Sequence, residues 1–195
     1  HLTSMKTYIL PSLKLTGVMI IICSILYPLL IAGIAKTAPG GGKGETIEVN
    51  EKVVGYANIG QKFTDDSYFC GRPSAVDYNA AGSGGSNKGP SNPEYLATVQ
   101  SRIDTFLVHN PEVKKTVIPA DLVTASGSGL DPNISVQAAK VQIARIAKIR
   151  NLAEKDVQLL VDQQIEKRLF GLLGPEKINV LKLNIALDKF TTTNN

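Results

Sequence analysis

The sequence predicts an α+β protein in which a single N-terminal transmembrane helix is followed by one compact soluble α+β domain. Two observations support this fold class: an uncharged apolar segment near the beginning of the chain, and later segments that alternate between helix-like periodicity and short β-type runs. We expect five parts: a short tail over 1–14, the transmembrane helix over 15–35, a Gly-rich linker over 36–45, the soluble domain over 46–190 and a tail over 191–195.

The apolar segment runs from Leu15 to Ala35 and contains six Ile, four Leu and one Val but no charged residue. As a helix its 21 residues would span about 31 Å, close to the roughly 30 Å of a bilayer core. Pro28 can kink such a helix without preventing insertion. We expect residues 1–4, which precede Met5, to be either a remnant of cloning or an over-extended start.

A cleaved signal peptide is the alternative interpretation of this segment. Small residues at 33–35 could form a cleavage site, but an apolar run of this length exceeds the 7–15 residues of a usual signal core, which favours a retained anchor. Lysines do not decide the orientation, because Lys6 and Lys14 precede the helix while Lys36 and Lys43 follow it.

After the linker, residues 47–63 contain short β-type runs that we expect to break at Gly55 and Gly60. Residues 64–92 are polar and rich in turn-forming residues. A short strand entering a second Gly/Ser turn is expected from Asp121 onward. The segment 178–188 alternates apolar and polar residues strictly, which predicts a half-buried strand with Asn184 on its polar face.

Three helices are expected between these β-type segments. The first starts either with Asn92 before Pro93 or with Ser91 and Glu94 as a capping box. Ser135 or Asn133 caps the second. The apolar positions expected to face inward are Leu96, Val99, Ile103, Phe106 and Leu107 in the first helix, Val136, Ala139, Ile143 and Ile146 in the second, and Val157, Leu160, Val161 and Ile165 in the third.

The charge distribution argues against nucleic-acid binding. The formal net charge is +4, but residues 44–195 carry 17 basic and 17 acidic residues, so the excess lies beside the apolar segment. A basic group at Lys140, Arg145, Lys148 and Arg150 is more typical of a solvated helix face than of a binding surface.

No catalytic, metal or cofactor constellation is found. The Gly-rich stretches lack the Lys-Ser/Thr that a phosphate-binding loop requires. Ser83 approximates a nucleophile elbow but has loop on both sides, and His109 is the only partner histidine once His1 is set aside. One Cys and one His, Cys70 and His109, cannot build a zinc site in the soluble part. We therefore expect no enzyme activity from this chain alone.

Four segments in order give the chain a resemblance to one family. They are "FCGRPSAVDYNAAGSGGSNKGPSNP" (69–93), "DLVTASGSGLDPNIS" (121–135), "QIARIAKIRNL" (142–152) and "INVLKLNIALD" (178–188). Together they resemble the C subunit of the Kdp potassium-transporting P-type ATPase. Departures from the family pattern occur at Cys70, Lys88, Asn133, Val136 and Asn151, and those at Lys88, Cys70 and Asn133 leave partner contacts there open.

The resemblance implies an accessory, non-catalytic subunit of a high-affinity ATP-driven potassium import complex. Its partners would be a channel-like potassium-translocating subunit, a P-type ATP-hydrolysing subunit, a small accessory subunit and membrane lipid. ATP and K+ would be used by the complex, with no cofactor bound by this chain. Two roles are implied: assembly or stabilisation, and raising the ATP affinity of the hydrolysing subunit.

The resemblance also implies a single-pass protein of the cell (inner) membrane with a cytoplasmic N-terminus and an extracytoplasmic, periplasmic domain. The alternative function is a membrane-anchored extracytoplasmic binding module for a small ligand. The polar loop residues expected to contact partners are Arg72, Asn79, Ser86, Asn87, Ser126, Ser128 and Asp131. An equally weighted reading is that these groups satisfy the backbone of their own loops.

Overall fold

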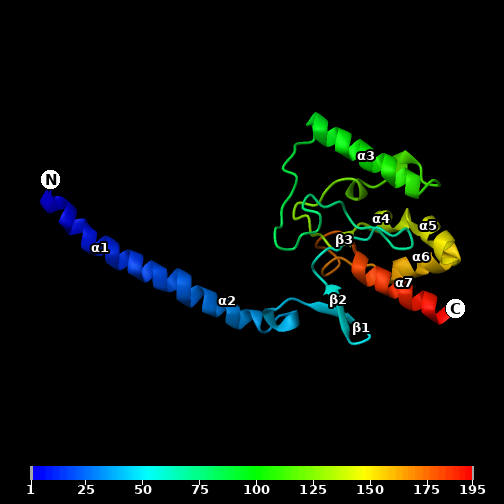
Figure 1. Cartoon of the computed structure of the whole chain (residues 1–195). Helices are drawn as coiled ribbons and strands as arrows, with labels where there is room; N and C mark the ends of the chain where they lie inside the picture. Colours follow the sequence, from blue (N-terminus) through cyan, green and yellow to red (C-terminus); the bar gives the residue numbers. More distant parts are fainter. Residues whose placement is uncertain (1, 195) are drawn as a thin grey trace. The chain divides into compact units, whose positions relative to one another are not determined.

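The computed structural model describes residues 2–194 and divides into two units, one ending at Glu45 and the other beginning at Thr46. The first unit is a continuous helical rod made of α1 (Leu2–Ile20), a π-helical turn η1 (Ile21–Leu26) and α2 (Tyr27–Ala35) (Figure 1). The span from Thr7 to Ala35, 29 residues, is long and apolar enough to cross a membrane. The helix therefore includes residues that the sequence assigned to the tail.

The π-helical turn η1 ends two residues before Pro28. Proline has no backbone N–H, so the helix cannot form its regular hydrogen bond at this residue. Widened turns are one of the recognised adjustments of a helix around such a position. After α2, a short 3₁₀ turn η2 (Pro39–Gly42) occupies the Gly-rich linker.

The second unit begins with an antiparallel hairpin of β1 (Thr46–Val49) and β2 (Lys52–Tyr56). Its two turn residues, Asn50 and Glu51, have φ of 50° and 62°, as expected in a type I′ turn that matches strand twist. The predicted break at Gly55 is wrong, because this glycine lies within β2. A Cβ there would lie 1.7 Å from Gln61 Nε2 and 2.8 Å from Leu181 Cδ2, so these side chains would have to move to accommodate any other residue.

The domain contains five helices among the described residues: α3 (Pro93–His109), α4 (Val136–Lys140), α5 (Ile143–Arg150), α6 (Glu154–Gln163) and α7 (Val180–Asn194). Asn92 caps α3 by accepting from Tyr95 N at 3.0 Å, and Ser135 caps α4 by accepting from Ala138 N at 3.1 Å. The structure thus selects Asn92 over the Ser91 and Glu94 capping box, and Ser135 over Asn133. Asn151, in the left-handed conformation with φ 54°, ends α5.

The core lies where α4, α5, α6 and α7 pack together, and α3 lies outside this group (Figure 1). Three inward positions predicted for the third helix are confirmed, with Val157, Leu160 and Val161 buried in α6. The fourth, Ile165, lies beyond the end of α6 and is partly buried against the core. None of the residues of α3 is buried, although Val99, Ile103 and Phe106 pack against the core. The inward placement of Leu96 is wrong, since 52% of this residue is exposed.

The predicted strand over 178–188 is wrong. Only β4 (Ile178–Asn179) is extended, pairing with β3 (Asn133–Ile134), and α7 starts immediately afterwards. The true apolar stripe is helical, because Val180, Leu183 and Leu187 are buried together with Asn184. A buried asparagine in the stripe made the pattern look like strand alternation.

The strand expected from Asp121 is also wrong. This stretch forms the 3₁₀ turn η4 (Ala120–Leu122), which follows another, η3 (Lys115–Val117). The Asp121 carboxylate accepts hydrogen bonds from Ser135 N at 2.7 Å and Ser135 Oγ at 3.1 Å. This aspartate therefore joins the turn to the cap of α4.

Candidate functional site

The two Gly/Ser loops, residues 71–92 and 124–131, lie against each other and are joined by hydrogen bonds. Gly84 N donates to the Ser128 carbonyl oxygen at 2.9 Å, and Ser83 Oγ donates to the same oxygen at 3.0 Å. Ser126 N donates to Pro73 O at 3.3 Å. Segments that are far apart in sequence thus form one surface, which we call the loop platform.

The glycines of the loop platform allow its two layers of backbone to touch. At Gly129, φ is +69° and a Cβ would lie 2.6 Å from Val76 Cγ2 and 2.8 Å from Gly84 O. At Gly85 a Cβ would lie 3.0 Å from Gly127 O. Side chains at these points would separate the loops.

Most of the predicted contact residues hold the loop platform together. Arg72 Nη1 lies 3.1 Å from Asp131 Oδ2, and both side chains are mostly buried, at 26% and 28% exposure. Asn79 Oδ1 accepts from Ala81 N at 3.0 Å, and Ser128 Oγ accepts from Leu130 N at 3.1 Å. Ser126 is buried.

Ser86 and Asn87 differ from the other predicted residues. Both are exposed, and neither side chain makes a hydrogen bond or ion pair with another residue of 2–194. Asn87 has φ of 53°, a left-handed conformation that asparagine tolerates better than most residues. These two side chains can therefore form hydrogen bonds with another molecule at the rim of the loop platform.

Tyr78 fixes the loop next to Arg72. Its hydroxyl donates to the Arg72 carbonyl oxygen, and its backbone N donates to Ser74 Oγ at 2.9 Å. Burial, followed by the nearby Cys70 and Asp131, raises the pKa of Tyr78 to about 12. The phenol consequently keeps its proton, and its hydrogen bond, over the whole neutral pH range.

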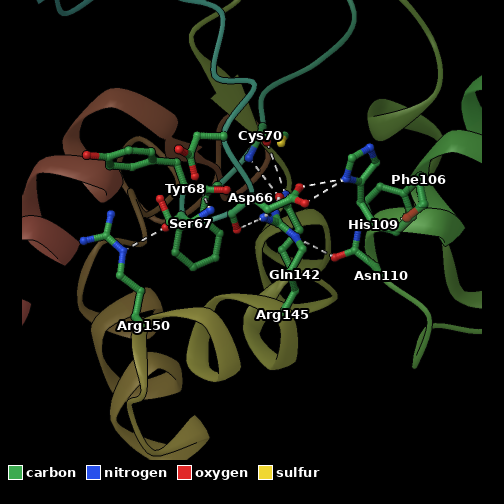
Figure 2. A network of polar contacts seen from close by, with 12 residues as sticks. Asp66, Ser67, Tyr68, Cys70, Phe106, His109, Asn110, Gln142, Arg145 and Arg150 are labelled. Carbon is green, nitrogen blue, oxygen red and sulfur yellow. Dashed lines mark hydrogen bonds and ion pairs between the residues drawn. The ribbon is translucent and has the colours of Figure 1, made fainter.

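A buried polar network lies beside the loop platform and was not foreseen (Figure 2). The guanidinium of Arg145 donates to four residues: to Asp66 O, to Tyr68 O at 3.1 Å, to Asn110 Oδ1 at 2.9 Å and to Gln142 Oε1 at 2.8 Å. Its side chain is only 5% exposed. The expectation of a solvated basic face is therefore wrong at Arg145.

Amide side chains complete the pairing of segment 65–72, which begins with a turn closed by Tyr68 N donating to Asp65 O at 3.1 Å. Gln142 accepts from Cys70 N at 2.8 Å and donates to Cys70 O at 3.2 Å. Asn184 accepts from Phe69 N at 2.9 Å and donates to Phe69 O at 3.0 Å. Both amides act on this backbone as a neighbouring strand would.

Arg150 holds the outer end of the same segment. Its Nε donates to Ser67 O at 2.9 Å, its Nη1 lies 2.7 Å from Asp188 Oδ1, and its guanidinium carbon lies 4.6 Å above the Tyr68 ring. Tyr68 OH also donates to Asp188 Oδ2 at 3.1 Å. Residues 65–72 are thus tied to both α5 and α7 by side chains.

A cavity of about 400 Å³ lies next to this network. Asp66, His109, Arg102, Arg145 and Cys70 are among its lining residues, and His109 Nδ1 lies 2.9 Å from Asp66 Oδ2. Burial raises the pKa of the Cys70 thiol above its ordinary value, which disfavours the reactive thiolate. The cavity therefore offers polar contacts without an activated nucleophile.

The structure also places the residues considered for catalysis. Ser83 donates to a backbone carbonyl, while His109 pairs with Asp66, so the two are engaged with different partners. Within residues 2–194 there is no group of three or more His, Cys, Asp or Glu that could hold a metal ion.

The buried network around Arg145 had one signal in the sequence. Gln142 and Arg145 are three residues apart, a spacing that places two side chains on the same face of a helix.

Comparison with known proteins decides the family. The family model described as "K+-transporting ATPase, c chain" matches residues 9–189. The chain belongs to the KdpC family. A potassium-transporting ATPase KdpC subunit of Flavobacterium psychrophilum is 62% identical over 177 residues, covering 91% of this chain and 95% of the relative.

Two further KdpC subunits are similar over comparable lengths. The KdpC subunit of Bacteroides thetaiotaomicron is 54% identical over 188 residues, covering 95% of this chain and 99% of the relative. That of Caldanaerobacter subterraneus subsp. tengcongensis is 49% identical over 177 residues, covering 90% and 92%. As a KdpC family member the chain is part of a potassium transport complex, and its apolar N-terminal helix is consistent with a membrane-anchored subunit.

Proposed function

We propose that this chain is an accessory, non-catalytic subunit that stabilises the assembled complex by docking its loop platform on a partner subunit. One observation carries the proposal: the platform is braced from within, yet leaves Ser86 and Asn87 exposed and unpaired at its rim within residues 2–194. Bracing of this kind lowers the entropy cost of binding, because the loops are ordered before the partner arrives.

The partners in this proposal are the channel-like potassium-translocating subunit, the P-type ATP-hydrolysing subunit and the small accessory subunit. The N-terminal helix would pack beside the channel-like subunit in the membrane, where close van der Waals contact and hydrogen bonds hold helices together. ATP and K+ would be handled by those partners. A role in raising ATP affinity would require coupling across the membrane if the domain is extracytoplasmic, so assembly is the role that we favour.

Replacing Ser86 by arginine is expected to lower recovery of the complex about tenfold when this chain is used to purify its partners, since a bulky charge would face the partner at the rim. Thermal unfolding of the isolated chain should be unchanged, because Ser86 is exposed. Gln163→Arg, an exposed change at the end of α6, serves as the control. Full recovery with Ser86→Arg would contradict docking through this rim, and ATP hydrolysis by the isolated chain would contradict a non-catalytic role.

A small-ligand binding module is the second candidate function, and the cavity of about 400 Å³ lined by Asp66, His109, Arg102 and Arg145 favours it. Such a ligand would raise the unfolding temperature of the chain in the absence of any other subunit. A thermal-shift screen of small polar compounds therefore separates this candidate from an assembly role.

We further propose that the domain is extracytoplasmic and the N-terminus cytoplasmic. A cysteine introduced at Asn195, with Cys23 and Cys70 replaced by serine, should react with a membrane-impermeant maleimide in intact cells. Cys70 must be removed because it is the other thiol of the domain. Labelling that appears only after lysis would place the domain in the cytoplasm and make direct contact with ATP the better explanation.

A further inference from the structure

A small hairpin, which we call the 166–177 finger, connects α6 to β4. Glu166 and Lys177 pair through two backbone hydrogen bonds of 2.8 and 3.2 Å. Leu169 N donates to Leu173 O at 2.9 Å, and the chain reverses at Phe170 and Gly171, whose φ values are 53° and 73°. The finger therefore has a defined, tightly turned tip.

The tip of the finger is apolar and exposed. Four large apolar side chains in a row, interrupted only by a glycine, are 61% to 84% exposed: Leu169, Phe170, Leu172 and Leu173. None of them belongs to the core cluster of the described residues. Phe170 is the most exposed of the four and occupies a backbone conformation that favours glycine, so neither packing nor turn geometry explains an aromatic residue here.

Basic side chains surround the base of this apolar tip. Lys167 and Arg168 are exposed immediately before it, and Lys177 follows it. Two acidic residues lie at the base as well: Glu166, which is shared between Lys177 Nζ and Lys182 Nζ at 3.5 Å each, and the exposed Glu176. The four Lys and Arg side chains named here outnumber them. Positive charge beneath a cluster of Leu and Phe side chains is the pattern of protein segments that lie in a membrane interface.

The covalent connection keeps the domain near a bilayer. The linker of residues 36–45 separates the apolar helix from the domain, and ten residues extend to at most about 36 Å. Once the helix spans a membrane, the linked end of the domain cannot leave the lipid surface by more than this length. A lipid surface is thus always close to the domain that carries the finger.

We propose that the 166–177 finger inserts its apolar tip into the lipid interface, with Lys167 and Arg168 at the level of the phosphate groups. This inference rests on the proposed membrane anchor. Lipid suits the finger better than a protein pocket, because four adjacent apolar side chains on a convex turn need only a fluid apolar layer, while the cations at the base match anionic headgroups.

The chain contains no tryptophan, so Phe170→Trp introduces a single fluorescent reporter at the tip. The full-length variant is assembled into lipid nanodiscs of equal parts phosphatidylglycerol and phosphatidylcholine. Lipids brominated in the upper part of the acyl chain are expected to quench its emission about twofold, as for a side chain lying at the headgroup and acyl boundary. Adding Leu172→Asp to this variant should abolish most of the quenching.

Val108→Trp is the matched control, because Val108 is a 78% exposed apolar residue on α3 rather than on the finger. Equal quenching of both reporters would overturn the proposal, as it would indicate non-specific adsorption. Co-elution with nanodiscs tests the anchor separately. A chain that co-elutes but whose Phe170→Trp reporter is not quenched refutes the finger alone, and a chain that does not co-elute refutes the anchor as well.

A last measurement repeats the quenching experiment with the other subunits of the complex present. If the Phe170→Trp reporter becomes shielded from water only when those subunits are present, and brominated lipid still does not quench it, the finger contacts a protein partner. That result would overturn lipid insertion.

Discussion

Replacing Arg145 by methionine is expected to lower the free energy of unfolding of the domain by about 3–5 kcal/mol. Methionine keeps much of the buried volume but removes the donors to the Asp66 and Tyr68 carbonyl oxygens and to the amide oxygens of Asn110 and Gln142. Among these residues, Asn110 and Gln142 are buried, so their side-chain oxygens would lose a partner away from water. Most substitutions of surface residues change the free energy of unfolding by much less than this.

Lys148→Met is the control for Arg145→Met. It removes the same charge from the same helix, but Lys148 is exposed, so a change within about 0.5 kcal/mol is expected. Thermal unfolding of both full-length variants in the same detergent should separate them by roughly 10 °C, because 1 kcal/mol corresponds to about 2–4 °C for a domain of this size. Similar unfolding temperatures would show that the guanidinium does not hold segment 65–72 in place.

Replacing Gly129 by alanine is expected to destabilise the domain by about 2–4 kcal/mol, combining overpacking with left-handed strain. The new methyl group would lie 2.6 Å from Val76 Cγ2 and 2.8 Å from Gly84 O, at a residue whose φ is +69°. The loops of the platform would then have to separate, and the exposed side chains at the rim would lose their support.

Gly127→Ala, two residues earlier in the same loop, provides the control. A Cβ at Gly127 would have no heavy atom within 4 Å, and its φ is not in the left-handed range. We expect this variant to unfold within about 1 kcal/mol of the parent, with any effect of reduced chain entropy favouring stability. Equal losses from the two substitutions would contradict the close contact between Gly129 and its neighbours.

Local signals in the sequence sufficed for the helix starts and for the hydrophobic face of α6. Asn92 before Pro93 and Ser135 before Val136 determine helix entry through contacts within three residues, so no knowledge of the tertiary structure is needed. The apolar stripe of α6 is equally local. Membership in the KdpC family was predictable because four segments occur in the expected order.

The incorrect predictions for Asn184 and Arg145 share one cause, which is that their binding partners are distant in the sequence. Asn184 is buried because Phe69, 115 residues away, presents its backbone amide and carbonyl to it, and this partner cannot be inferred from a hydropathy pattern. Arg145 is buried for the same reason, since its acceptors include residues 66, 68 and 110. Polar residues whose partners lie far along the chain look like surface residues in the sequence.

The sequence predicted which residues make up the candidate site but not whether they contact a partner or one another. The sequence indicated the Gly/Ser loops and could not decide between partner contacts and internal bracing. The answer depends on which loop lies opposite which: Ser128 accepts from Gly84 and Ser83, whereas Ser86 lies only a few residues further and remains exposed. Loop pairing of this kind is a property of the tertiary fold.

The Gly-rich linker has a consequence for how strongly each half of the chain must bind. A flexible linker of ten residues has a root-mean-square length of about 17 Å, so when one unit is attached to a complex, the other is confined near it at an effective concentration in the millimolar range. If the apolar helix and the domain both contact the complex, as we propose, two individually weak attachments would combine into a long-lived association through avidity. Lengthening residues 36–45 would weaken that association without altering a single contact.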